Sequence, residues 1–277
     1  MTWLLLDVGN TALKWALARP EEPRELARGI LALGAGFADA LASTLKACLA
    51  GYPAVAGDPM AALGCSVASD AATRQVSAAV TPWAPDGVRW LGSQPCFEYR
   101  GVALVNGYRD PAQLGADRWN AMIAARQLFP GLPLVVVCAG TATTVDSVDA
   151  SGRFLGGAIA PGTSLMADSL ARGTARLPRS AGRPVAMPDN TDDAIATGVA
   201  EAMAGLVERR VRALAHLGSP PQLVLGGGRV RELASRLALG SEVAGITIEE
   251  QLVLRGLWFR ASASAQGPFG SGPRDRA

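Results

Sequence analysis

Several kinds of site are excluded by what this chain lacks. His216 is its only histidine, so neither a histidine-containing zinc site nor a Ser-His-Asp triad is expected. The four cysteines show no C-x-x-C spacing, and a free cysteine in apolar surroundings behaves as a small hydrophobic residue. His216 itself ends a long helical stretch, which predicts a surface histidine near a helix C-terminus.

Long apolar runs and an excess of charge are also missing. No segment reaches the roughly 20 apolar residues that a membrane helix needs. The N-terminal apolar run is interrupted by Asp7 and has no basic leader, so no secretory signal is expected. The formal net charge of +2 gives no electrostatic reason to expect a nucleic acid or a membrane surface as partner. We therefore expect a protein of the reducing cytoplasm.

What is present begins with an apolar strand and a turn at the N-terminus. Leu4-Leu5-Leu6 predicts a central strand, and Gly9-Asn10 predicts a tight turn with positive φ angles. The residues from Ala12 to Leu17 then predict the returning strand. Backbone N–H groups converge in such a turn, which suits a phosphate.

The polar residues of this stretch add to the phosphate hypothesis. Asp7, at the end of the strand, can hold Mg²⁺ through water, because Mg²⁺ prefers oxygen ligands and keeps several waters. Thr11 adds a hydroxyl group, and Lys14, one of only two lysines, adds a cation. An ordinary hairpin with a polar turn would explain the same residues.

The scheme of strand, glycine turn and returning strand occurs a second time. The run Leu134-Val135-Val136-Val137-Cys138-Ala139 leads into Gly140-Thr141, and a second strand follows. Two such units predict a duplicated domain with a phosphate held between the halves. A third glycine cluster, Gly226-Gly227-Gly228, follows a short apolar strand and precedes a helix expected over 229–238. Glycine there lets the backbone approach a flat ligand such as adenosine, although a plain strand-to-helix turn is the alternative.

The remaining pattern alternates strands and helices, which predicts an α/β layer architecture. We expect strands at 25–33, 61–68 and 88–91, and helices at 37–49, 71–80, 116–129 and 163–171. A long helix follows, with Thr191 as its N-cap. Residues 92–114 are expected to be irregular, 156–162 a glycine-flanked turn, and 173–188 a mobile loop. The expected divisions are an N-terminal half at 1–115, a C-terminal half at 116–262 and a disordered tail at 263–277.

A carboxylate and a guanidinium stand side by side in Gly115-Ala116-Asp117-Arg118, at a predicted helix start. The planar fork of Arg118 matches a carboxylate, so it can clamp an acidic substrate. Asp117, aimed at a hydroxyl group, can act as general base for attack on a γ-phosphate. The alternative is that Asp117 caps the helix and Arg118 pairs locally.

Four motifs now occur in order, and together they resemble the type III pantothenate kinases, the family that includes the Bvg accessory factor proteins. They are Asp7-Val8-Gly9-Asn10-Thr11, Tyr108 with Gly115-Ala116-Asp117-Arg118, Gly140-Thr141-Ala142-Thr143-Thr144, and Gly156-Gly157-Ala158-Ile159-Ala160-Pro161-Gly162. The resemblance implies two ribonuclease-H-like halves of the acetate kinase, sugar kinase, Hsp70 and actin superfamily. It also implies ATP-dependent phosphorylation of pantothenate, the first step of coenzyme A biosynthesis, by a homodimer that needs Mg²⁺ and a monovalent cation, K⁺ or NH₄⁺.

The resemblance also implies roles for particular residues. Asp7-Val8-Gly9-Asn10-Thr11-Ala12-Leu13-Lys14 would form the first phosphate loop, and Thr141 would contact ATP from the second. Asp117 would accept the proton. The pantothenate site would consist of Tyr108, Gly115, Ala116, Asp117, Arg118 and, from the partner subunit, Thr191.

One position departs from the family pattern. Family members usually carry Asp where this chain has Cys138, and that carboxylate is associated with the monovalent cation. A neutral thiol is a poor ligand for such hard cations, which prefer oxygen. The cation site is therefore either lost or built from carbonyl oxygens.

Two other functions stay open on the sequence. One is a kinase or polyphosphate phosphohydrolase of the same superfamily with another substrate, which the set of Tyr108, Asp117 and Arg118 disfavours. The other is a non-catalytic regulator that keeps the ATP fold as a switch, which Cys138 favours and which the intact Asp7 and Asp117 oppose.

Overall fold

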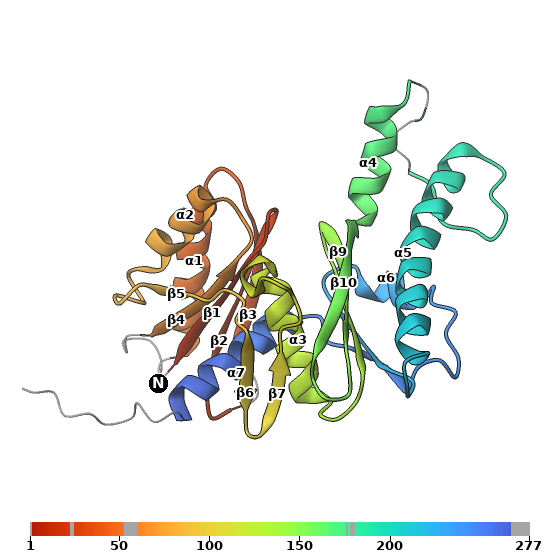
Figure 1. Ribbon diagram of the computed structural model, residues 1–277. Coiled ribbons are helices and arrows are strands. Elements are labelled where there is room, and N and C mark those ends of the chain that lie inside the picture. The colour runs from red at the N-terminus through yellow and green to blue at the C-terminus, as the bar shows by residue number, and fades with distance from the viewer. Residues whose placement is uncertain (1, 23–24, 53–59, 176, 178–180, 267–277) are drawn as a thin grey trace, which may run out of the picture. The chain divides into compact units, whose positions relative to one another are not determined.

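The chain folds into two compact units, each built on its own five-stranded sheet (Figure 1). The computed structural model describes residues 2–22, 25–52, 60–175, 177 and 181–266. Unit 1 comprises Met1–Ser93, Leu114–Asn120 and Val253–Ala277, and unit 2 comprises Gln94–Gln113 and Ala121–Leu252. The units are therefore discontinuous in sequence, unlike the contiguous segments expected from the motifs. Within the described residues, no helix is both long and apolar enough to cross a membrane.

The sheet of unit 1 has the order β3-β2-β1-β4-β5. Its strands are β1 (Trp3–Val8), β2 (Ala12–Ala18), β3 (Glu25–Ala32), β4 (Ala61–Ser66) and β5 (Val88–Trp90). The first three are antiparallel neighbours, and β4 and β5 add to β1 in parallel. The predicted hairpin and the three later strands of this half are confirmed.

The sheet of unit 2 repeats this topology with the order β10-β9-β8-β11-β12. Its strands are β8 (Leu134–Ala139), β9 (Ala142–Val148), β10 (Phe154–Pro161), β11 (Gln222–Gly226) and β12 (Gly245–Ile248). Again three antiparallel strands are followed by two parallel ones. Two sheets of identical strand order confirm the predicted duplication and the α/β class.

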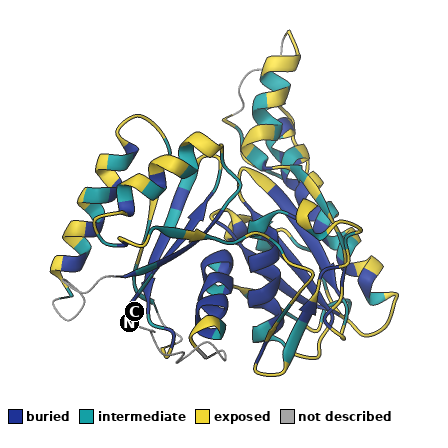
Figure 2. Cartoon of the chain, turned by 60° about the vertical axis from the view of Figure 1, so that its left-hand side comes forward, coloured by how far each residue is buried: buried dark blue, intermediate teal, exposed yellow. Residues whose placement is uncertain are grey.

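Helices cover each sheet and make its core. They are α1 (Phe37–Ala50), α2 (Asp70–Val80), α3 (Ala116–Leu128), α4 (Thr163–Gly173), α5 (Thr191–Ala215), α6 (Val230–Ala234) and α7 (Leu252–Gln266). On one face of β1, Leu4, Leu6 and Val8 pack against α1 and α2. On the corresponding face of β8, Val135, Val137 and Ala139 pack against α5 and α6. Figure 2 shows the buried strands in dark blue under helices whose outer turns are exposed.

Several local expectations were wrong. Residues 92–114 contain a hairpin, β6 (Cys96–Tyr99) with β7 (Val102–Val105), and a 3-10 turn at Pro111–Gln113. Residues 156–161 belong to the edge strand β10, because their glycines and alanines pair with β9 without needing large side chains. The helix expected over 229–238 is only the short α6, and β12 and α7 were not expected.

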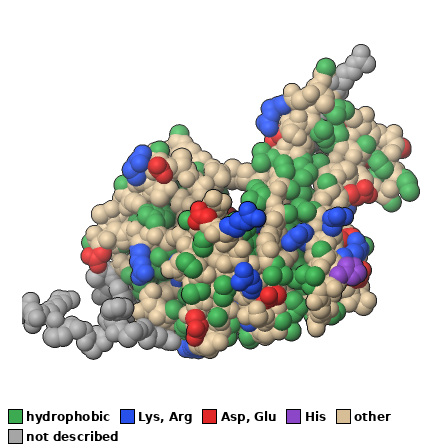
Figure 3. Space-filling model, in the orientation of Figure 1, with side chains coloured by type: hydrophobic (Ala, Val, Ile, Leu, Met, Phe, Trp, Pro, Cys, Tyr) green, Lys and Arg blue, Asp and Glu red, His purple; other side chains and the backbone are tan. Residues whose placement is uncertain are grey.

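The ends of some elements also differ from expectation. Asn190, and not Thr191, is the N-cap of α5: the Asn190 side chain accepts a hydrogen bond from the N–H of Asp193 at 2.9 Å. α7 continues through Gln266, so the first residues of the expected tail are helical. Residues 267–277 and part of the loop expected over 173–188 (176 and 178–180) lie outside the described residues, and the described part of that loop beyond α4 has no helix or strand. His216 is exposed at the C-cap of α5, as predicted (Figure 3).

Candidate active site

The first glycine turn follows β1 directly and connects it to β2. The N–H of Gly9 donates to the carbonyl of Ala12 at 3.0 Å, and the N–H of Asn10 has no hydrogen-bond partner in the described part of the chain. Neither Gly9 nor Asn10 has a positive φ, so that expectation was wrong. Three residues link the strands, and this longer loop does not need the left-handed conformation of a two-residue turn.

Strand pairing places Asp7 between two reactive side chains. Asp7 lies opposite Lys14 on β2 and beside Cys65 on β4, so the three residues form one row across the sheet. The Cys65 thiol donates to Asp7 Oδ1, with a distance of 3.8 Å between the atoms. The structure thus brings together Asp7 and Lys14, as the motif predicted, and adds a buried cysteine.

Burial dominates the electrostatics of Asp7, whose residue surface is 8% exposed. Desolvation raises the pKa of Asp7 from its ordinary 3.8 to about 6, Lys14 acts in the opposite direction, and the negative charge of Asp117 raises it further. Asp7 and Asp117 are therefore electrostatically coupled, although 110 positions separate them in sequence. A cation at Asp7 would relieve the cost of its buried charge.

Asp117 and Arg118 lie in the first turn of α3, as expected. Asp117 is half-buried, and its Oδ1 accepts a hydrogen bond from the backbone N–H of Arg118 at 2.8 Å. A Cβ atom on Gly115 would lie 2.7 Å from that same oxygen, so any larger residue at position 115 would clash with the Asp117 carboxylate in this position. Arg118 is almost fully buried, and Gly115 and Ala116 are half-buried beside it. All four residues belong to unit 1, together with the first phosphate loop.

The other predicted substrate residues belong to unit 2. Tyr108 lies after β7, where its backbone N–H donates to Asn106 Oδ1 at 3.0 Å and its ring packs on Phe154 with centroids 5.2 Å apart. Thr191 is the exposed first residue of α5. The structure describes these two residues within unit 2 and does not relate them to Asp117.

The second turn and the third glycine cluster meet within unit 2. The N–H of Gly140 donates to the carbonyl of Ala142 at 3.1 Å, and the N–H of Gly162 donates to that of Thr141 at 2.9 Å. A Cβ atom on Gly162 would lie 2.2 Å from the Gly140 carbonyl oxygen. Gly227, with φ +101°, would bring a Cβ atom equally close to the last carbonyl of β8. Only glycine permits these approaches. The turn at Gly140-Thr141, the segment that ends at Gly162 and the Gly226–Gly228 cluster therefore form one backbone cradle.

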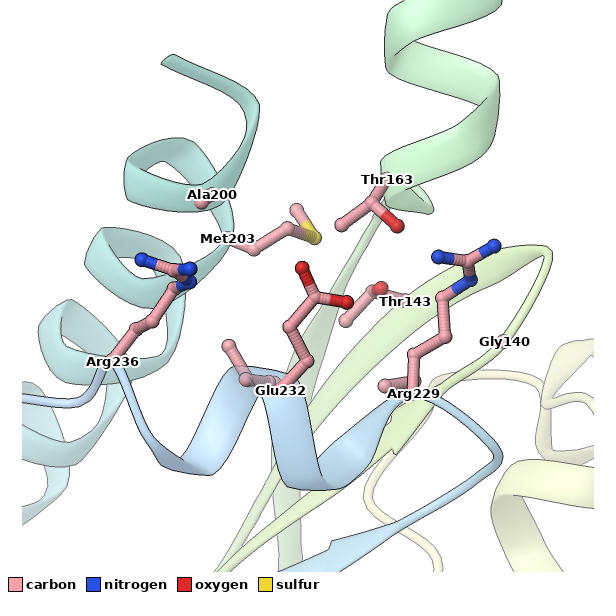
Figure 4. Close-up of a pocket in the computed structure, with 10 residues that line it drawn as sticks. Gly140, Thr143, Thr163, Ala200, Met203, Arg229, Glu232 and Arg236 are labelled. Carbon is pink, nitrogen blue, oxygen red and sulfur yellow. The ribbon is translucent and has the colours of Figure 1, made fainter. Parts of the chain in front are cut away.

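A pocket opens beside this cradle (Figure 4). Its lining comes from β8, β9, α4, α5 and α6, from the turn after β8 and from the residues on either side of α6: Ala139, Gly140, Thr143, Thr163, Ala200, Met203, Arg229, Glu232, Leu233 and Arg236. The buried Oγ1 of Thr163 has no hydrogen-bond partner among the described residues. Figure 4 shows the side chains of Thr163, Met203, Arg229 and Glu232 around this pocket. The Thr163 hydroxyl and the side chains of Arg229 and Arg236 fit a phosphorylated ligand, because each can donate hydrogen bonds to phosphate oxygens.

Cys138 occupies in unit 2 the position that Asp7 occupies in unit 1. Each lies two residues before the first glycine of its turn, and Cys138 pairs with Thr144 on β9 and Gly226 on β11. The half-buried thiol supplies no carboxylate for a cation. In the part of the chain that the structure describes, no three His, Cys, Asp or Glu side chains gather into a metal site.

Sequence reasoning missed several residues near these motifs. Cys65 was treated only as a small hydrophobic residue, yet the pairing of β4 with β1 places it against Asp7. The position of Cys65 near the end of an apolar run, like that of Asp7, was the available signal. Thr163 and Arg229 directly follow glycine motifs that the sequence did reveal, and their side chains line the pocket.

Comparison with known proteins identifies the family. The family described as type III pantothenate kinase matches residues 3–213. This chain belongs to that family. A type III pantothenate kinase from Paracidovorax citrulli is 40% identical over 262 residues, which cover 93% of this chain and 96% of the relative. Another from Polaromonas sp. is 42% identical over 259 residues, 91% of this chain and 96% of the relative.

Two solved structures of low sequence identity share the fold of this chain. A conserved Campylobacter jejuni protein, described as a Baf family transcriptional activator, aligns with a TM-score of 0.54 and 17% identity over 95% of this chain and 98% of its own. The activator of a 2-hydroxyisocaproyl-CoA dehydratase from Clostridium difficile, with bound ADPNP, aligns with a TM-score of 0.51 and 15% identity, covering 96% and 97%. The expected α/β fold of two duplicated halves is therefore shared with these two proteins.

Proposed function

We propose that this protein transfers the γ-phosphoryl group of ATP to the hydroxyl of pantothenate, giving 4'-phosphopantothenate and ADP, the first step of coenzyme A biosynthesis. Membership of the type III pantothenate kinase family supports the substrate and the reaction. The structural observation that supports it best is the coupled pair Asp7 and Asp117, one carboxylate suited to a metal and one to a proton.

The proposed step is an in-line displacement. The pantothenate hydroxyl oxygen forms a bond to the γ-phosphorus while the bond from that phosphorus to the β,γ-bridging oxygen breaks, and ADP leaves. Asp117 accepts the hydroxyl proton. Mg²⁺, when bound, neutralises charge on the phosphates, and Asp7 would hold it through water. Because such a transfer needs little covalent chemistry from the protein, the residues act mainly by positioning and charge.

The remaining residues have proposed binding roles. Residues 7–14, with Lys14 as their cation, and Thr141 bind the phosphates. Arg118, Tyr108, Gly115 and Ala116 line the pantothenate site, where the Arg118 fork suits the substrate carboxylate. The pocket of unit 2 takes the nucleoside, with the Gly226–Gly228 backbone beside it.

Assembly and ions complete the proposal. A homodimer would let Thr191 of the partner subunit reach pantothenate, and the exposure of Thr191 in one chain is compatible with that role. The monovalent cation, K⁺ or NH₄⁺, lacks its usual carboxylate because of Cys138, so any such site would use carbonyl oxygens. We also propose a cytoplasmic location, where the four cysteines, none of which forms a disulfide, would stay reduced.

An acceptor panel tests this proposal against its alternatives. We expect the purified protein to release ADP from ATP only when pantothenate is present, and Asp117→Asn to lower turnover by about 100-fold or more while ATP still binds. ADP release that ignores pantothenate would favour a phosphohydrolase. Nucleotide binding without turnover on any acceptor would favour the alternative that Cys138 supports, a non-catalytic regulator. Running the panel with and without K⁺ tests the cation requirement.

A further inference from the structure

Unit 1 contains a buried arginine that pairs with no carboxylate among the described residues. Arg260, on α7, is 5% exposed. Its Nη1 donates to the carbonyl oxygen of Gly92 at 2.9 Å and to Asn120 Oδ1 at 3.3 Å. A buried charge is costly even when neutral groups hydrogen-bond to it. An apolar side chain would fill the same space with a smaller desolvation cost. Packing alone therefore does not explain why position 260 carries a charge.

The partners of Arg260 lead toward Asp7. Asn120, fully buried on α3, accepts from Arg260 and donates through Nδ2 to the Ala116 carbonyl at 2.8 Å. The Asn120 side chain also lies close enough to the Cys65 thiol to interact with it. Cys65, fully buried on β4, donates in turn to Asp7 Oδ1. Asn120 and Cys65 therefore lie in series between a buried cation and a buried carboxylate, with a hydrogen bond at each end of the series.

Two features hold this series in place. The parallel pairing of β1 with β4 fixes Cys65 directly beside Asp7. A Cβ atom on Gly256, one helical turn before Arg260 on α7, would lie 1.9 Å from the Asn120 carbonyl oxygen, so α7 packs closely on α3.

We propose that Arg260, Asn120 and Cys65 form a buried positioning chain that fixes the Asp7 carboxylate for binding Mg²⁺·ATP. The inference rests on the proposed function in one respect, the role of Asp7 at the metal and nucleotide. None of the three residues touches a substrate in this account, so they act through Asp7. Partners that orient a metal-associated group commonly change affinity or activity by about 10- to 100-fold when removed.

The test measures binding of Mg²⁺ with the non-hydrolysable analogue AMP-PNP by calorimetry, without pantothenate. Cys65→Ala should weaken binding by about tenfold, because a freed carboxylate samples other orientations. Cys48→Ala, the same change at a half-buried cysteine on α1, is the matched control and should stay within about twofold of wild type, since that residue lies outside the chain. Cys65→Ser restores a donor and should bind more like wild type than like Cys65→Ala.

A double-mutant cycle then asks whether the residues act together. If Cys65 and Arg260 act through one chain, Cys65→Ala combined with Arg260→Met should weaken binding no more than the worse single variant does. The Michaelis constant for pantothenate should stay within about twofold in the Cys65 variants, because Asp7 serves the nucleotide. Should Arg260→Met fail to fold, Cys65→Ala and Cys65→Ser still decide the question.

The outcomes separate this inference from the proposed function. Equal binding by Cys65→Ala and Cys48→Ala, serine no better than alanine, or additive effects in the cycle would each overturn the positioning chain. A wild-type protein that binds the analogue but does not phosphorylate pantothenate would overturn the proposed function and leave the chain to be judged by binding. A wild-type protein that binds no Mg²⁺·AMP-PNP would overturn both.

Discussion

Replacing Asp7 with asparagine is expected to make the metal-free protein more stable at neutral pH while abolishing its activity. Burial raises the pKa of Asp7 from 3.8 to about 6, so the ionised form is disfavoured in the folded state. A shift of about two units corresponds to roughly 3 kcal/mol of stability that is lost at pH 7. The asparagine side chain would carry no charge to desolvate. This figure already includes the favourable interaction of Lys14 with the ionised carboxylate.

The pH dependence gives the sign of this effect. Below pH 3.8 Asp7 is protonated in both the folded and the unfolded state, so its burial costs no stability; the cost develops as pH rises from 3.8 and is complete above about 6. Thermal unfolding in EDTA should therefore show Asp7→Asn melting higher by several degrees, up to roughly 10 °C, at pH 7.5. That difference should shrink steadily as the pH is lowered toward 4. A variant that melts at or below wild type at pH 7.5, or a gain independent of pH, would refute the reasoning.

Three further predictions concern single positions. Lys14→Met removes the cation that opposes the desolvation of Asp7. We expect the variant to be less stable than wild type by thermal unfolding, with a larger loss at pH 7 than at pH 4. We also expect calorimetry to show weaker ATP binding. Gly227→Ala strains a φ of +101° and meets a carbonyl at 2.2 Å, so thermal unfolding should show a loss of about 2 kcal/mol or more. Gly228→Ala, which meets nothing within 4 Å, is its control and should change little. Cys138→Asp should increase the dependence of turnover on K⁺, which assays in K⁺-free buffer would detect; identical K⁺ dependence would contradict it.

Much of the fold was predictable because local pattern and topology agree. Apolar runs followed by glycine turns at Gly9 and Gly140 specified the first strands of both sheets, and the similarity of the two runs specified the duplication. The hairpin β6–β7 was missed because each of its strands is only four residues long. Glycine and proline at 156–161 favour a turn because both are common in turns, although an edge strand such as β10 tolerates them.

The candidate site was predictable only where its residues lie in motifs. Asp7 and Asp117 lie in short sequence motifs whose residue types indicate the chemistry. Cys65 and Arg260 acquire their role from strand register and helix packing, since 58 and 253 positions separate them from Asp7 in sequence. A local sequence pattern cannot predict contacts between residues so far apart in the chain. The N-cap of α5 shows that sequence also fails to fix the exact end of a helix. Asn190 and Thr191 are both good N-cap residues, and only the backbone conformation shows which of them caps the helix.

The most direct measurement follows the phosphoryl group itself. Purified wild-type protein and Asp117→Asn are incubated with Mg²⁺, ATP and pantothenate, and the products are identified by mass spectrometry. We predict one 4'-phosphopantothenate for each ADP with wild type, and neither product above background with the variant. Equal yields from the two proteins, or ADP without phosphorylated pantothenate, would contradict the assignment of Asp117 as the base of a pantothenate kinase.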